Sequence, residues 1–116
     1  MRLFTEEEFK KVNIYVGLTI KFKRLKLGLS QFQLAVNVGS NNTSIGRIER
    51  AEHFSGWDKI ITITQFLDID FCELMVIKDK KEILKLVNDC YILEEKLTSQ
   101  KENYYVELLE KISKYF

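Results

Sequence analysis

The stretch that decides the fold is GLSQFQLAVNVGSNNTSIGRIER, residues 28–50 of this chain. Ser30 is a good N-cap, so a short helix is expected over about 31–38. Gly39 suits the left-handed turn that would end this helix, because a β-carbon resists that conformation. Asn41 then caps a further helix over about 42–50. Two short helices joined by a tight turn are therefore predicted.

The spacing of small and aliphatic residues across the turn supports a helix-turn-helix. Ala35 is small where the next helix has to cross closely, and Ile45 and Ile48 lie on the inner face of that helix. These aliphatic side chains are expected to pack against Leu34 and Val38. The whole unit is thus predicted to be held by a small apolar core.

Upstream of this unit, the sequence predicts a helix from about residue 6. Thr5 and Glu8 form the capping box T-x-x-E, and apolar residues follow at helical spacing. Gly17 is expected to interrupt the helix, after which the pattern resumes and stops at Gly28. Downstream, a fourth helix is expected from Ser55 or Gly56, and a fifth short helix after a turn around Asp68.

From about Asp79 onward the pattern becomes that of a coiled coil. Apolar residues recur every seven positions and are joined by a second set at the matching position between them. These heptad residues are Ile83, Leu86, Cys90, Leu93, Leu97 and Tyr104. Pairing between two chains is the favoured interpretation, because a five-helix domain already closes its own core. The alternative is a helix or hairpin folded back on its own domain.

Charge is concentrated around the central stretch, although the whole chain carries only +1. Residues 18–53 hold six basic and two acidic side chains, a net of +4, whereas residues 54–76 hold one basic and four acidic, a net of −3. The two flanking segments are balanced. Such a local excess is the electrostatic footprint that a nucleic-acid partner requires.

The same stretch resembles the Cro/CI-type (XRE) family of helix-turn-helix DNA-binding regulators. The matching residues are Arg24, Gly28–Gln31, Leu34, Ala35, Gly39, Ile45, Arg47, Ile48 and Glu49. The chain departs from the family pattern at Ala51, where Gly is usual, at Ser55, where Pro is usual, and at Lys23. The resemblance covers about residues 18–75 and implies an all-α, five-helix, lambda-repressor-like fold that binds DNA.

In such a unit the third helix, about 42–50, enters the major groove and reads base edges. The positions expected to point outward are Asn42, Thr43, Gly46 and Arg47. Asn can pair with adenine and Arg with guanine through two hydrogen bonds, each pair discriminating by about 1–3 kcal/mol. Gly46 is expected either to allow close approach to DNA or to be merely tolerated.

Phosphate contacts are expected from polar and basic residues around the two helices, namely Ser30, Gln31, Asn41, Arg50 and Lys21. The role of Gln31 is implied by the family resemblance. Arg24 and Glu49 match family positions that commonly form an internal ion pair, so both are interpreted as structural.

A single small helix-turn-helix reads few base pairs, and dimers bind half-sites about 34 Å apart. The expected organisation is an N-terminal helical extension (1–17), a DNA-binding domain (18–76) and a C-terminal helical dimerisation segment (77–116). The expected function is sequence-specific binding of a palindromic operator in double-stranded DNA by a homodimeric transcriptional repressor. The alternative is an antitoxin or adaptor whose C-terminal helices bind a partner protein.

Several other classes of protein are not expected. His53 is the single histidine, and no catalytic grouping, phosphate loop or metal-ligand spacing is visible, so neither an enzyme nor a cofactor is predicted. Cys72 and Cys90 are interpreted as buried thiols of a reduced, cytoplasmic protein. No apolar run approaches the ~18–20 residues that span a bilayer, so a membrane partner is not expected.

Overall fold

The computed structural model describes residues 4–52, 55–94 and 98–116, and within these ranges the chain forms helices and no strand. The expected all-α class is therefore confirmed. The helices are α1 (Glu6–Lys26), α2 (Gln31–Asn37), α3 (Asn42–Glu49), α4 (Trp57–Phe66), α5 (Phe71–Leu74), α6 (Lys80–Leu93) and α7 (Ser99–Tyr115).

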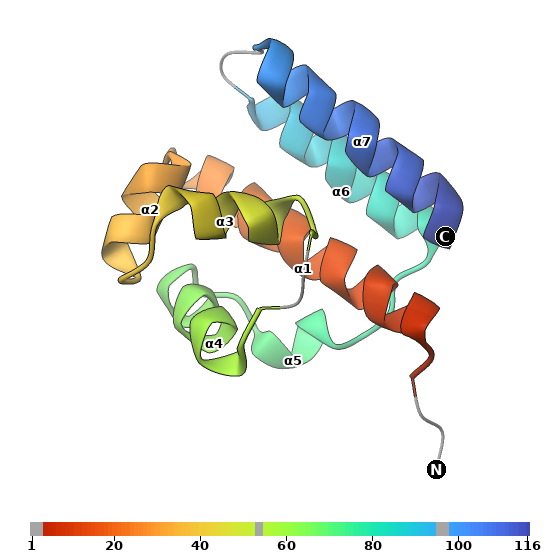
Figure 1. The fold of residues 1–116 in the computed structure, drawn as a ribbon, viewed down its shortest axis with the longest axis horizontal. Helices are drawn as coiled ribbons and strands as arrows, with labels where there is room; N and C mark the ends of the chain where they lie inside the picture. Colours follow the sequence, from red (N-terminus) through yellow and green to blue (C-terminus); the bar gives the residue numbers. More distant parts are fainter. Residues whose placement is uncertain (1–3, 53–54, 95–97) are drawn as a thin grey trace.

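The long helix α1 runs through the middle of the molecule, with α2–α5 on one side and α6 and α7 on the other (Figure 1). It begins at the expected capping box, in which the Thr5 hydroxyl accepts from the Glu8 N–H and the Glu8 carboxylate accepts from the Thr5 N–H. The expected interruption at Gly17 does not occur. The boundary expected between residues 17 and 18 consequently falls inside one continuous helix.

Gly17 instead marks the place where α1 and α3 cross. A β-carbon at residue 17 would collide with the backbone carbonyl of Ile48, at a separation that real β-carbons essentially never show. The glycine is buried and its neighbours across the contact are backbone atoms, which cannot swing aside. Close approach of the two helices therefore explains this glycine.

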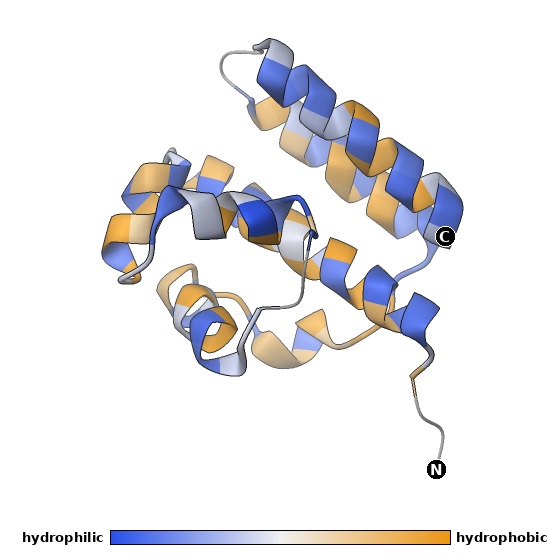
Figure 2. Ribbon diagram, in the orientation of Figure 1, coloured by the Kyte–Doolittle hydropathy of each residue, from blue (hydrophilic) through white to orange (hydrophobic). Residues whose placement is uncertain are grey.

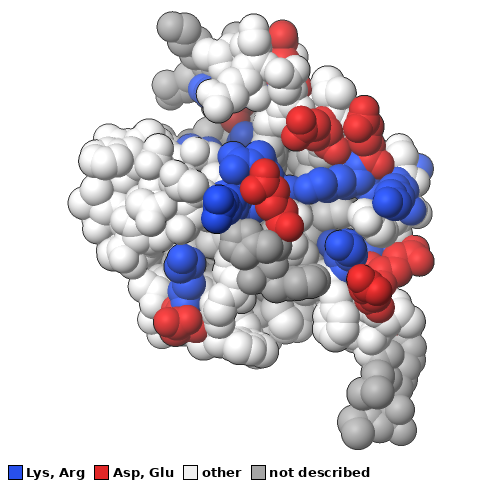
Figure 3. All heavy atoms as spheres, in the orientation of Figure 1, with Lys and Arg blue, Asp and Glu red and all other residues white. Residues whose placement is uncertain are grey.

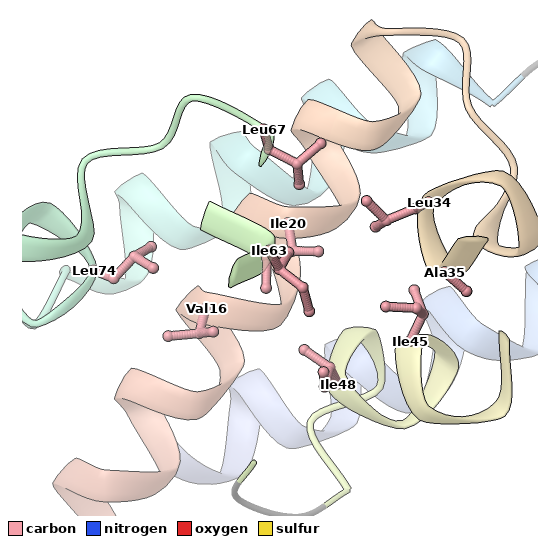
Figure 4. Close-up of a cluster of buried hydrophobic side chains, with 9 residues drawn as sticks. All are labelled: Val16, Ile20, Leu34, Ala35, Ile45, Ile48, Ile63, Leu67 and Leu74. Atoms are coloured by element: carbon pink, nitrogen blue, oxygen red, sulfur yellow. The ribbon is translucent and has the colours of Figure 1, made fainter. Parts of the chain in front are cut away.

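The first apolar core joins α1 to α2, α3, α4 and α5 (Figure 4). Its buried members are Val16, Ile20, Leu34, Ala35, Ile45, Ile48, Ile63, Leu67 and Leu74. Every one of these five helices thus contributes at least one fully buried side chain, and removing apolar surface from water holds them together.

The second apolar core lies on the opposite face of α1, where Ile14 and Leu18 meet α6 and α7. The two C-terminal helices run side by side as a hairpin, and each alternates hydrophilic and hydrophobic residues (Figures 1 and 2). The hairpin contributes Ile83, Val87, Cys90, Tyr105, Leu108 and Ile112. α1 is therefore covered on both faces, which gives a single molecule with two adjoining cores.

The heptad residues pack within their own chain, so their expected role as an inter-chain seam is corrected. Ile83 and Cys90 are fully buried in the second core, Leu86 and Tyr104 pack against it, and Leu93 is half-buried. Leu97 lies outside the described residues. A seven-residue repeat specifies an apolar stripe but not its partner, and the second face of α1 supplies that partner here.

The two cysteines differ in environment. Cys90 is buried, as expected, with its sulfur 3.7 Å from the Leu18 carbonyl oxygen. Cys72 is exposed, which corrects the expectation that both thiols are buried. It lies in the first turn of the four-residue helix α5, where Leu74 is the residue directed into the core.

Candidate nucleic-acid interface

The helices α2 and α3 are joined by the tight turn that the sequence predicts. Gly39 has φ of +66°, and the Ser40 N–H donates to the Ala35 carbonyl over 2.9 Å. Across the turn, Ile45 and Ile48 of α3 share the first core with Leu34 and Ala35 of α2. The orientation of α3 against α2 is thus set by both backbone geometry and packing.

The outward face of α3 carries the three polar side chains expected there. Asn42, Thr43 and Arg47 are all exposed. Asn41 caps the helix, because its Oδ1 accepts from the Ser44 N–H over 2.9 Å. The cap uses the oxygen of this amide and leaves the nitrogen to donate elsewhere. An amide, a hydroxyl and a guanidinium therefore stand on one accessible surface.

Gly46 does not belong to this outward face, so its expected contact with base edges is corrected. It is buried, and a β-carbon there would lie 2.9 Å from Nη1 of Arg50 and 3.5 Å from Oε1 of Gln31. These are the ends of long side chains that cover the residue. Helical periodicity alone did not predict that α2 would overlie this position.

Arg50 is restrained by Glu52, a residue for which the sequence predicted no role. Its Nε donates to Oε1 of Glu52 over 2.8 Å, and both side chains are partly exposed. The hydrogen bond from Arg50 lowers the pKa of Glu52. A phosphate that contacts Arg50 would therefore also lie near the Glu52 carboxylate. Repulsion between these two anions weakens Arg50 as a phosphate contact.

Gln31 is half-buried and hydrogen-bonded within the protein itself. Its Nε2 donates to Oε1 of Glu49 over 3.0 Å, which uses one of the two N–H groups of this amide. The other N–H group remains for the expected phosphate contact. Ser30 is exposed and forms a capping box with Gln33, with its hydroxyl accepting from the Gln33 N–H and the Gln33 side chain accepting from the Ser30 N–H. The S-x-x-Q spacing was a signal for this cap.

Arg24 and Glu49 form the expected internal ion pair between α1 and α3. Nε of Arg24 lies 2.7 Å from Oε2 of Glu49 and Nη2 lies 3.0 Å from Oε1, while Nη1 donates to the Leu29 carbonyl. Both groups are buried. Burial opposes the charged guanidinium, but the bonds to Glu49 raise the pKa of Arg24 overall. This two-bond geometry locks α3 onto α1.

Lys21 lies far from solvent, so its expected contact with phosphate is corrected. Only 4% of the residue is exposed, and its Nζ lies 3.1 Å from Oε1 of Glu94. The ammonium also sits over the rings of Tyr104 and Tyr105, at 3.6 and 4.8 Å from their centroids. Burial lowers the pKa of Lys21 despite the nearby carboxylates of Glu49 and Glu94. This lysine ties α1 to the hairpin.

Two residues of α7 that the sequence reading did not assign to the site contact the end of α3. The Tyr104 hydroxyl donates to the Glu49 carbonyl over 3.0 Å, and Nζ of Lys111 donates to the Arg50 carbonyl over 2.6 Å. Their spacing of seven residues, which places them on one helix face, was the available signal. The heptad reading included Tyr104 but gave no role to Lys111.

The electrostatics of the α2–α3 surface are weak for a polyanion partner. α2 contains no charged residue, and α3 contains only Arg47 and the buried Glu49. Figure 3 shows few charged atoms over α2, with basic and acidic atoms meeting toward the middle of this face. The local positive excess in the sequence is reduced in the fold, because Lys21 and Arg24 are both internal.

Comparison of the chain with family models, with curated proteins and with solved structures found no match. The likeness to Cro/CI-type regulators therefore stands on the quoted residues. Across the ranges that the structure describes, no helix is long and apolar enough to cross a membrane. Within those same ranges, no three metal-ligating side chains are grouped so that they could hold an ion.

Proposed function

We propose that this chain binds double-stranded DNA sequence-specifically and regulates transcription, with α3 as its recognition helix. The observation that carries the proposal is that α3 exposes Asn42, Thr43 and Arg47 on one face. The other face of this helix is packed tightly against the rest of the protein. The contacts that hold α3 in place are the first core, the Arg24–Glu49 ion pair and the close crossing with α1 at Gly17. A preorganised helix loses little conformational freedom on binding.

The exposed groups have the chemistry of direct base readout. In the major groove, Arg47 can donate two hydrogen bonds to guanine, Asn42 can pair with adenine, and Thr43 can contact a thymine methyl. Asn41 and Ser30 flank this set at the starts of α3 and α2, where they can donate to phosphate. Arg50 completes the proposed contacts.

Few basic side chains are exposed on α2 and α3, so the DNA affinity is expected to depend only weakly on salt concentration. The logarithm of the DNA affinity falls with the logarithm of salt concentration by about 0.9 for each phosphate neutralised. With Arg50 as the cationic phosphate contact and Arg47 on a base, a slope of roughly −1 per chain is expected. Specificity has to come mainly from base contacts and from a second copy of the chain.

We propose that the second copy docks on the outer surface of the hairpin, because the heptad residues pack inside the chain, in the second core. Exposed apolar side chains on that hairpin are Leu84 and Tyr91 of α6 and Val106 and Leu109 of α7. The exposed charges of α6 are mainly basic, Lys80, Lys81 and Lys85 against Glu82, although Lys85 also pairs with Asp89. Those of α7 are mainly acidic, Glu102, Glu107 and Glu110 against Lys114. A two-fold axis that sets α6 against the partner's α7 brings these opposite charges together.

Selection of bound fragments from random duplexes tests the DNA proposal. An enriched motif should bind the wild-type chain more tightly than a scrambled duplex at one fixed salt concentration. Arg47→Ala should lower the affinity for that motif by about 1–3 kcal/mol, roughly five- to 150-fold. Lys10→Ala removes the same charge from an exposed position outside the proposed DNA and dimer contacts, and it is the matched control. Equal binding of all duplexes would exclude sequence-specific recognition.

Glu52→Gln provides a second test, in which the DNA affinity is expected to rise and not to fall. A neutral amide in place of this carboxylate accepts a weaker hydrogen bond from Arg50 and removes a negative charge beside the proposed phosphate contacts. DNA affinity should rise a few-fold at low salt, and the salt slope should steepen. Glu7→Gln, which changes an exposed carboxylate of α1 outside the proposed DNA and dimer contacts, should change neither as much.

The exposed apolar side chains of α6 and α7 also favour the second candidate function, a protein-binding adaptor or antitoxin. The mass of the purified protein at micromolar concentration shows whether the chain is a monomer, as the adaptor function allows, or a homodimer. Leu109→Glu should convert a dimer into monomers by placing a charge in the interface. A chain that is monomeric and does not discriminate between duplexes would support the adaptor instead.

A further inference from the structure

The last carbonyl groups of α3 can be accounted for one by one. A helix leaves its C-terminal carbonyls without partners inside the helix. The Ala51 N–H donates to the Ile48 carbonyl and the Glu52 N–H donates to the Arg47 carbonyl, with Ala51 at φ of +54°. This is the Schellman arrangement, and it satisfies two of the terminal carbonyls from within the local chain.

The three carbonyls that follow are satisfied by α7. The Tyr104 hydroxyl donates to the Glu49 oxygen over 3.0 Å. Nζ of Lys111 lies 2.6 Å from the Arg50 oxygen and 3.4 Å from the Ala51 oxygen. A cation at this position also complements the partial negative charge at the end of a helix. Two side chains of one helix thus complete the end of another.

The two donors are held in place by the packing of α7. They lie seven residues apart, on the flank of a helix whose inner face buries Tyr105, Leu108 and Ile112. The Tyr104 ring is fixed further by the Lys21 ammonium above it and by its edge-to-face contact with Tyr105, at 4.9 Å between centroids. The contact with α3 therefore depends on the hairpin remaining docked on α1.

We propose that Tyr104 and Lys111 are positioning residues for DNA recognition, so that α7 acts as a brace for the end of α3. The proposal rests on the proposed function. The last turn of α3 carries Arg47, and its C-cap is Arg50. Loss of the brace lets this end fray and disperses both guanidinium groups, while the first core continues to hold the rest of the helix.

The variants that test the brace remove donors and leave the packing atoms in place. Lys111→Met keeps the aliphatic stem, and Tyr104→Phe keeps the ring. Lys111→Arg restores a cationic donor. Lys114→Met is the control, because it removes the same charge from an exposed position on the same helix. Amide hydrogen exchange on the free protein and binding to the selected and the scrambled duplex are measured for each.

In Lys111→Met and Tyr104→Phe, the amides of Arg50, Ala51 and Glu52 should exchange about tenfold faster than in Lys114→Met. Affinity for the selected duplex should fall about five- to tenfold, with binding to the scrambled duplex matching the control. Lys111→Arg should recover most of both effects. The thermal midpoint should change little, whereas a purely structural role would lower it without altering specificity.

Exchange and affinity equal to those of the control would overturn the proposal. Faster exchange at residues 50–52 with unchanged affinity would overturn the positioning role. If the wild-type chain fails to discriminate between duplexes, the proposed function fails. Exchange at residues 50–52 still decides, in that case, whether α7 braces α3.

Discussion

At the scale of single residues, the crossing of α1 and α3 depends on the absence of a side chain at Gly17. We expect Gly17→Ala to lower the free energy of unfolding by about 3 kcal/mol or more, because the β-carbon meets the Ile48 carbonyl and neither helix can yield freely. Denaturant titration measures the change.

Gly46→Ala is the matched control for this substitution. Here the β-carbon meets the flexible end of Arg50, which can move, and alanine gains about 1 kcal/mol of helix propensity over glycine. A change near zero or a small gain in stability is expected. Similar losses at both positions would show that the α1–α3 crossing is not the tighter of the two contacts.

The Arg24–Glu49 pair gives a second prediction at this scale. Arg24→Ala leaves the Glu49 carboxylate buried, with Gln31 as its one remaining side-chain donor among the described residues, at a cost of about 3–5 kcal/mol. Replacing Arg24 and Glu49 together by Met should cost much less, because no charge is left without a partner. Urea unfolding of both variants measures the difference, and equal damage from the two would contradict the pairing.

At the scale of secondary-structure elements, the docking of the hairpin on α1 controls access to Cys90. Burial raises the pKa of the Cys90 thiol to about 12, so the reactive thiolate is scarce at neutral pH. Cys72 is exposed. A thiol reagent should therefore modify one cysteine per chain rapidly in the folded protein, and the second only when the hairpin opens.

The Cys72→Ser variant isolates this measurement. Its remaining thiol should react at least a hundredfold more slowly than the exposed thiol of Cys90→Ser, and denaturant should abolish the difference. Rapid labelling of Cys90 under native conditions would show that the hairpin is not stably docked.

At the scale of the whole molecule, a buried charge cluster links α1, α6 and α7. Glu94 pairs with Lys21 over 3.1 Å and with Lys101 over 3.3 Å, and accepts from the Tyr105 hydroxyl over 3.2 Å. Burial raises the pKa of Glu94, but the two ammonium groups hold it below its ordinary value. The folded state therefore binds this proton less readily than the unfolded chain does.

The stabilisation from Glu94 is complete above the pKa of the unfolded chain, about 4.5, and is lost as the pH falls through the lower folded value. Glu94→Gln should be less stable than wild type at pH 7, and this difference should shrink below about pH 4.5. Chemical unfolding across this range measures it, with the exposed Glu107→Gln as control. A constant difference would contradict the role of the carboxylate.

The two cores share α1, so the molecule should unfold as one unit. A chain that ends after Lys78 exposes Ile14 and Leu18, at about 1.5–3 kcal/mol each, and leaves Lys21 without Glu94. These losses are comparable with the whole stability of a small domain. Circular dichroism should detect no cooperative thermal transition in this fragment, and a sharp transition would show that residues 1–78 fold independently.

How far the sequence could predict the fold depends on whether a feature is local. Thr5, Ser30 and Asn41 cap helices as expected, because a cap involves residues three apart in the chain. Gly39 adopts the expected turn for the same reason. The reading of Gly17 as an interruption was wrong, because its neighbour across the contact is 31 residues further along the chain.

In the candidate site, too, the features that depend on local sequence were predicted and those that depend on other parts of the fold were not. Exposure of Asn42, Thr43 and Arg47 follows from helical periodicity once Ile45 and Ile48 are taken as the inner face. Lys21 was misplaced because Glu94 and α7 cover it, and no pattern in residues 18–50 reports on these neighbours. Gly46 was misplaced because Gln31 of α2 and Arg50, one turn further along the chain, lie over it. Gln31 remains a predicted phosphate contact, and its additional hydrogen bond to Glu49 depends on a residue 18 positions further along the chain.

By itself, then, the sequence determined the caps at Thr5, Ser30 and Asn41, the helices that they begin, the turn at Gly39 and the apolar stripe of the heptad residues. Each of these depends on interactions within a few residues of chain or on a simple period. Tertiary structure alone decided that the stripe packs on α1, that Lys21 is internal and that Lys111 completes the end of α3. A period specifies which face of a helix is apolar, whereas the neighbour that covers it is chosen by how all the faces can be buried together.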